Sequence, residues 1–257
     1  MLRRALHSLA LALVFGSGLV SVATARAKWH YSAAVRTNVG TYVATSTVHN
    51  YYFTHGMLYE HGRWDLGAHL SLAARQGDDL VVGGGMMSGQ GGHDAMKVGL
   101  GDLFLRAEYT LLRQRSGWPN VTLGALTKAP TASASSGLGT GEWDGGVSML
   151  LTRFVWSLYL STEVGHLWLG DPPGATYRNP VTFAVGVGRA FASGRLGILL
   201  LYSGTSRVFA GYELPRQVGI GLNWRLSNRL GAFTNVVRGV SPTVPDLGLS
   251  LGVNTAL

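Results

Sequence analysis

The sequence predicts an all-β protein, a transmembrane antiparallel β-barrel of about 12 strands preceded by a signal peptide. Apolar side chains alternate with small or polar ones along most of the chain, which is the period of a strand whose two faces meet different surroundings. Short and long connections between these segments also alternate. The second face is rich in Gly, Ser, Ala and Asn, which makes a poor solvent surface. A soluble β-sandwich or lipocalin-like barrel is therefore disfavoured.

The first 27 residues have the order of a secretory signal peptide. Arg3 and Arg4 precede a mostly apolar run from Ala5 to Val22, and two small-x-small cleavage sites follow between Ala23 and Ala27. An uncleaved anchor helix is the alternative, and it is disfavoured because the cleavage sites follow the run directly. The expected organisation is a signal peptide over 1–27 and a barrel over 28–257. Cleavage removes three arginines and lowers the formal net charge from +8 to +5.

Two sets of segments make up the predicted strands. The clearest alternation lies near 64–73, 102–111, 156–165, 181–188, 217–226 and 247–257. Weaker segments lie near 29–40, 50–60, 120–129, 143–153, 195–204 and 229–239. Leu199 and Leu201 break the alternation in one weak segment, and Arg238 has no clear side in another. The facing of 50–60, 195–204 and 229–239 is therefore left open.

The connections give an independent signal. Short ones are predicted at 60–63, 113–120, 152–154, 191–195 and 227–229, and long ones at 41–49, 76–97, 130–142, 170–179, 203–215 and 240–246. Outer-membrane barrels have tight periplasmic turns, longer outer loops and an even strand number. The seven tryptophans lie mostly near predicted strand ends, as the aromatic girdles of such barrels do.

Composition excludes several classes of function. The chain has no Cys, so it forms no disulfide, thiolate metal site or Cys nucleophile. No Lys- or Arg-rich block is present, and nucleic acid is therefore not an expected partner. The eight His show no ligand spacing, and neither a metal nor a cofactor is expected.

Several short motifs resemble a known family. They are Gly99-Leu100-Gly101-Asp102, Ala107-Glu108-Tyr109, Lys128-Ala129-Pro130-Thr131, Gly137-Leu138-Gly139-Thr140-Gly141 and Asp144. This pattern resembles the outer-membrane transporter family named for the meta-pathway of phenol degradation, most specifically over 98–153. The resemblance implies the outer membrane of a Gram-negative-type bacterium and passage of small molecules, including aromatic or hydrophobic compounds. The implied partners are outer-membrane lipid, small-molecule solutes and the barrel assembly machinery. Unlike most such barrels, the chain ends in a non-aromatic residue, Leu257.

Charged residues collect on the inward face when the alternation is projected onto a barrel, because charges are costly in lipid. These are Arg36, Asp65, Arg75, Asp102, Arg106, Glu108, Lys128, Asp144, Glu163 and Arg225, and His69 joins them. Seven are predicted to line the lumen or its constriction: Asp102, Arg106, Glu108, Lys128, Asp144, Glu163 and Arg225. Our hypothesis is that Asp102, Arg106, Glu108 and Lys128 line the narrowest part. The alternative is a mutually paired network with no role toward solutes.

Passive passage of small molecules through this barrel is the predicted function, without catalysis. One alternative is a plugged barrel with a structural or surface-adhesion role. Another is a hydrolase at the barrel rim that uses Asp78, Asp79 and His93, although the chain lacks a Gly-x-Ser-x-Gly motif. The Gly-rich segment 83–92 lacks the Lys-Ser/Thr pair and helix of a phosphate-binding loop, so an outer loop that folds into the mouth is favoured.

Overall fold

The computed structural model describes residues 29–41, 47–77, 96–208 and 211–257. The predicted signal peptide over 1–27 lies outside these residues. Within these ranges, no helix is long and apolar enough to cross a membrane. The secondary structure of the described residues is almost entirely β-strand, with a single 3-10 turn at Ala192–Gly194.

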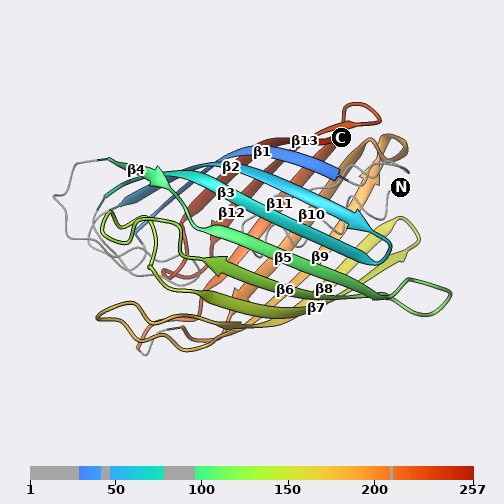
Figure 1. Cartoon of the computed structure of the whole chain (residues 1–257). Coiled ribbons are helices and arrows are strands. Elements are labelled where there is room, and N and C mark those ends of the chain that lie inside the picture. Colours follow the sequence, from blue (N-terminus) through green and yellow to red (C-terminus); the bar gives the residue numbers. More distant parts are fainter. Residues whose placement is uncertain (1–28, 42–46, 78–95, 209–210) are drawn as a thin grey trace.

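All strand pairs are antiparallel, and apart from β4 and β5 each strand pairs with its neighbours in sequence (Figure 1). The strands are β1 (Trp29–Gly40), β2 (Val48–His61), β3 (Trp64–Gln76), β4 (Lys97–Leu100), β5 (Leu103–Leu112), β6 (Asn120–Ala129), β7 (Asp144–Val155), β8 (Leu158–Trp168), β9 (Val181–Phe191), β10 (Leu196–Thr205), β11 (Arg216–Arg225), β12 (Leu230–Gly239) and β13 (Leu247–Ala256). The first strand closes the barrel on the last, with His30 opposite Ala256. β4 and β5 both pair with β3 and together make one of 12 positions in the wall, so the predicted strand number is confirmed.

The break between β4 and β5 falls at Gly101 and Asp102. The Gly101 amide still donates to the Ser71 carbonyl at 2.7 Å, and a Cβ at Gly101 would lie 3.3 Å from that oxygen. The short strand β4 lies at the edge of the predicted long connection 76–97. The break leaves Asp102 outside the strand, where its carboxylate accepts a hydrogen bond from the loop amide of Ala132.

The two faces of the wall differ as predicted. On β13, Leu247, Leu249 and Leu251 are exposed on the outside, whereas Ser250 and Asn254 are buried inside. Apolar side chains that would be costly in water cover the outside of the other strands as well, which is the surface that lipid requires.

The structure also decides the facing of the three weak segments. Asn50 and Leu58 on β2, Leu199 and Leu201 on β10, and Phe233 on β12 are buried on the inside. Arg238 is exposed and lies on the outer face, by alternation with the half-buried Val237 and Gly239.

Tryptophans mark both ends of the barrel. Five lie at the end with the short turns: Trp29, Trp64, Trp118, Trp156 and Trp224. Trp143 and Trp168 lie at the end with the long connections. All seven are exposed, as expected for rings at the two membrane interfaces.

One predicted turn was wrong. The turn expected at 152–154 lies at Trp156 and Ser157, where Val155 pairs with Leu158 across a two-residue hairpin. Thr152 is buried inside, and Arg153 is exposed near the strand end. Trp156 adopts φ 52°, the left-handed conformation that tight hairpin turns require.

Candidate functional site in the barrel lumen

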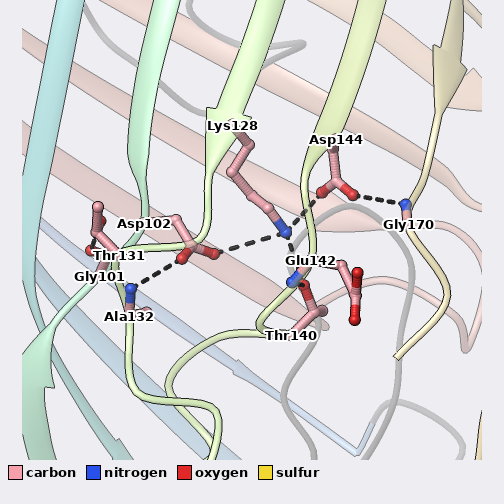
Figure 2. Close-up of polar contacts among 9 residues, drawn as sticks. All are labelled: Gly101, Asp102, Lys128, Thr131, Ala132, Thr140, Glu142, Asp144 and Gly170. Carbon is pink, nitrogen blue, oxygen red and sulfur yellow. Dashed lines mark hydrogen bonds and ion pairs between the residues drawn. The ribbon is translucent and has the colours of Figure 1, made fainter. Parts of the chain in front are cut away.

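Lys128 forms a buried ionic cluster at the end of the barrel that carries the long connections (Figure 2). It lies directly opposite Asp144 in the β6–β7 ladder, and its Nζ is 2.6 Å from Asp144 Oδ2. The same ammonium lies 3.6 Å from Asp102 Oδ2 and donates to Thr140 Oγ1 at 2.9 Å. We call Lys128, Asp102, Asp144 and Thr140 the mouth clamp.

The mouth clamp ties two connections to the strand ends. Asp102 Oδ1 accepts the Ala132 amide at 3.0 Å, and Asp144 Oδ1 accepts the Gly170 amide at 3.0 Å (Figure 2). Thr140 Oγ1 also accepts the Glu142 amide at 3.2 Å. Both carboxylates thus hold a loop amide with one oxygen and face the shared ammonium with the other.

The connection over 130–142 folds into the mouth of the barrel. Its Ala132 and Leu138 are buried against Ala73, which faces inward from β3, and Tyr52 of β2 packs on the same group. A Cβ on Gly99 of β4 would come within 2.8 Å of the Leu138 side chain, so the leucine rests on bare backbone there. The loop leaves β6 and reaches the inner side of β2, β3 and β4.

A second contact joins two other connections. Tyr177 and Val208 are buried together with Leu169 and Ala175 packed against them, and the Arg178 amide donates to the Val208 carbonyl at 2.9 Å. Burial raises the pKa of the Tyr177 hydroxyl, and the carboxylates of Asp144 and Asp171 raise it further. These loops are therefore packed together beside the mouth clamp.

Further inside, a second group of charges spans β5 and β8. Arg106 Nε lies 3.0 Å from Glu108 Oε1. Glu163 on β8 is almost fully buried and interacts electrostatically with both members of that pair. Arg36 on β1 donates to Ser250 Oγ at 3.2 Å, and the His69 ring stacks on Phe104 at 4.8 Å. We call Arg106, Glu108 and Glu163 the lumen belt.

The structure thus divides the residues predicted to line the lumen into three places. Asp102, Lys128 and Asp144 belong to the mouth clamp, and Arg106, Glu108 and Glu163 belong to the lumen belt. Arg225 lies apart from both, at the end with the short turns, and its Nη2 faces the Ser193 carbonyl at 3.5 Å. The four residues expected to line the narrowest part therefore fall in two separate ionic groups. Their role in a constriction stays a prediction.

Sequence reasoning missed an apolar group inside the barrel. Tyr159, Ala184, Leu199, Leu201 and Phe233 form one buried cluster on the inner face. Its signal was present as the broken alternation at Leu199 and Leu201, which put large apolar side chains where small or polar ones were expected.

Among the described residues, no group of three or more His, Asp or Glu side chains is placed to hold a metal ion. Asp78, Asp79 and His93, the residues of the alternative rim hydrolase, lie outside the described ranges, as does the Gly-rich segment 83–92. The described part of the lumen carries charged groups, hydrogen bonds and an apolar surface.

A closed barrel with a lipid-compatible exterior and a charged interior is a β-barrel of the bacterial outer-membrane type. The sequence over 30–257 matches the family model described as the MetA-pathway of phenol degradation, and the chain belongs to this family. The expected family is thereby confirmed. No curated protein matches the sequence.

Solved structures share this fold at low sequence identity. An outer membrane channel from Pseudomonas putida F1 has a TM-score of 0.72 at 11% identity, covering 91% of this chain and 97% of that one. The CymD monoaromatic hydrocarbon channel has a TM-score of 0.53 at 10% identity, covering 97% and 93%. The NanC porin has a TM-score of 0.55 at 11% identity, covering 89% and 100%. At these identities the likeness shows the fold.

Proposed function

We propose that this protein is an outer-membrane channel through which small molecules pass without energy input. The observation that carries the proposal is the mixed-sign lumen belt, held inside a closed barrel whose exterior is apolar. Charged side chains are costly to place in a membrane protein, and rings of such groups around a pore select the solutes that enter it. A 12-stranded barrel lies between small barrels filled by side chains and wide aqueous porins, so a few side chains are enough to set its bore.

Aromatic or hydrophobic compounds are our candidate solutes. The similar CymD is by its name a channel for monoaromatic hydrocarbons. The apolar cluster around Leu199 and Phe233 supports the same class here, because it offers an apolar surface inside the barrel.

Liposome swelling tests passage directly. The full chain is refolded into vesicles and challenged with neutral solutes graded in size and polarity. Entry of small, weakly polar solutes with a sharp size limit is expected. Vesicles with folded protein that swell no faster than empty ones, for every solute, would contradict passive passage.

Selectivity in planar bilayers tests the lumen belt. Arg106→Ala removes the cation of the belt and leaves Glu108 without its ion-pair partner, so any residual current should shift toward cations. Arg153→Ala is the matched control, because Arg153 is exposed on the outer face near a turn. Unchanged selectivity in Arg106→Ala would remove the belt from the mechanism.

A plugged barrel is the second candidate function, and the inward fold of the loop 130–142 favours it. The same swelling assay separates the two, because a plugged barrel admits nothing. We propose no enzymatic activity; hydrolysis of peptide or lipid substrates by the refolded chain would overturn that.

Export and assembly complete the proposal. We propose that residues 1–27 are removed on export, which N-terminal sequencing of the membrane-bound protein tests by finding Lys28 first. We also propose that the barrel assembly machinery inserts the chain, so its depletion should lower the amount of folded protein in the membrane.

A further inference from the structure

Four large side chains that face the barrel interior are almost fully covered by other protein atoms. Tyr159 and Leu199 are 0% exposed, Phe233 is 2% exposed and Leu201 is 5% exposed. We call these four residues the apolar collar. The Phe154 ring lies 5.2 Å from the Tyr159 ring and extends the collar onto β7.

The register explains how such large groups fit on this wall. Leu199 is flanked by Gly188 on β9 and Gly221 on β11, and Leu201 is flanked in the same way by Gly186 and Gly219. The glycines on both neighbouring strands leave room for each leucine side chain to lie over their backbone. Interiors of small barrels are often filled in this way, by large side chains that alternate with small ones.

Phe233 also packs closely against a glycine of a neighbouring strand. A Cβ on Gly252 would lie 2.4 Å from Phe233 Cζ, so the ring is in contact with the β13 backbone. Ala34 of β1 and Val237 of β12 pack against the same cluster. The apolar surface is therefore continuous around one side of the interior, from β7 and β8 through β10 and β12 to β1.

We infer that the apolar collar is a water-excluding constriction, which blocks ions and strongly hydrated solutes and leaves a path only for weakly hydrated, apolar ones. The inference rests on the proposed passage through this barrel and specifies which side chains set its selectivity. An ion that passes an apolar constriction loses hydration and gains no polar contact in return, and such constrictions gate pores by dewetting. The burial of all four collar side chains shows that they pack against one another and against neighbouring residues, so no open gap lies beside them at this place.

Ion conductance of the refolded full chain in planar bilayers tests the inference. Wild-type protein should show almost no ion current, and Leu199→Ala combined with Phe233→Ala should gain a steady current because the gap admits water. Leu200→Ala is the matched control: the same substitution on the neighbouring residue, which is exposed to lipid, should leave the current at the wild-type level. A steady wild-type current that the collar variants do not change would overturn the inference.

Cysteine labelling gives a second readout that does not depend on the double variant conducting. The chain contains no Cys, so a single Leu199→Cys substitution reports this position alone. It should resist a membrane-impermeant thiol reagent in the otherwise wild-type barrel and react when Phe233→Ala is added. Ser116→Cys, in an exposed turn, is the positive control. Rapid labelling of Leu199→Cys in the wild-type background, or protection that persists with Phe233→Ala in a folded barrel, would overturn the inference.

These outcomes are distinct from failure of the proposed function. Small polar solutes that swell vesicles through a wild-type barrel would contradict the collar and leave passive passage intact. A barrel that admits neither polar nor apolar solutes would contradict passive passage itself.

Discussion

Replacing Lys128 by methionine removes the cation of the mouth clamp and keeps most of the side-chain volume. The Lys128 side chain is 3% exposed, and the side chains of its partners Asp102 and Asp144 are 9% and 21% exposed. In Lys128→Met these carboxylates remain near one another, desolvated and of like charge. Thr140 Oγ1 loses one of its two donors at the same time and keeps the Glu142 amide.

The magnitude follows from the distances and from burial. Removing one partner of a buried ion pair costs about 3–5 kcal/mol, because an uncompensated charge stays behind. Asp144 is partly exposed and water screens it, so about 2–4 kcal/mol is expected here. Detaching the loop 130–142 hydrates both carboxylates and relieves this cost. The change should therefore favour local opening of the mouth more than global unfolding.

Amide hydrogen exchange in micelles measures that opening. The Leu138 amide, which donates to the Ser133 carbonyl at 3.1 Å, and the Ala132 amide, which donates to Asp102, report on the docked loop. Their protection should fall by roughly 30- to 700-fold in Lys128→Met, since each 1.4 kcal/mol is a factor of about ten. Amides of the central strands should keep their protection.

A charge-matched variant separates electrostatics from packing. Adding Asp144→Asn to Lys128→Met removes one of the two unbalanced charges and should recover a large part of the lost protection. Arg153 lies on the outer face at the opposite end of the barrel, so Arg153→Met should leave the exchange protection of the Leu138 amide unchanged. Protection at Ala132 and Leu138 that stays at the wild-type level in Lys128→Met would show that the mouth clamp does not hold the loop.

Three further predictions concern packing, lipid contact and pH. Gly252→Ala places a methyl group on the Phe233 ring and should destabilise the barrel by about 1–3 kcal/mol in urea unfolding, whereas Gly145→Ala, whose nearest neighbour atom would be 4.0 Å away, should be nearly neutral. Equal midpoints for the two variants would contradict the close contact. Leu251→Arg on the lipid face should cost about 2–4 kcal/mol if that residue lies near the bilayer midplane, while Leu251→Phe should be tolerated; a stable, fully inserted Leu251→Arg barrel would contradict the assigned face. Because the pKa of Tyr177 is raised on folding, the stability it contributes is present below its ordinary pKa of 10.0 and is lost as the pH rises above that value. Exchange protection at the Arg178 amide should fall at alkaline pH in the wild type and not in Tyr177→Phe.

The lumen belt and the mouth clamp show how far the candidate site could be predicted. Alternation alone placed Glu108, Lys128 and Glu163 on the inner face, because charges avoid lipid. It could not predict which charges meet. Lys128 pairs with Asp102 only because the chain breaks at Gly101 and turns that carboxylate toward a loop, and a break in a strand has no reliable local signal.

The inward position of the apolar collar could not be predicted from the sequence. The sequence around Leu199 and Leu201 does not decide which face of the strand points inward, because a one-residue shift in register exchanges the two faces. Its glycine neighbours lie on β9 and β11, and their proximity is known only once the strands are paired.

The sequence by itself determined the strand number, the lipid-facing side of the clear segments and the positions of most connections. These depend on a two-residue period and on turn chemistry, which are local properties of the chain. The tertiary structure alone decided the inward fold of the loop 130–142, the partners of Lys128 and the interior position of Leu199. Each of these depends on side chains from strands far apart in sequence meeting across a closed wall, and a local pattern carries no information about that meeting.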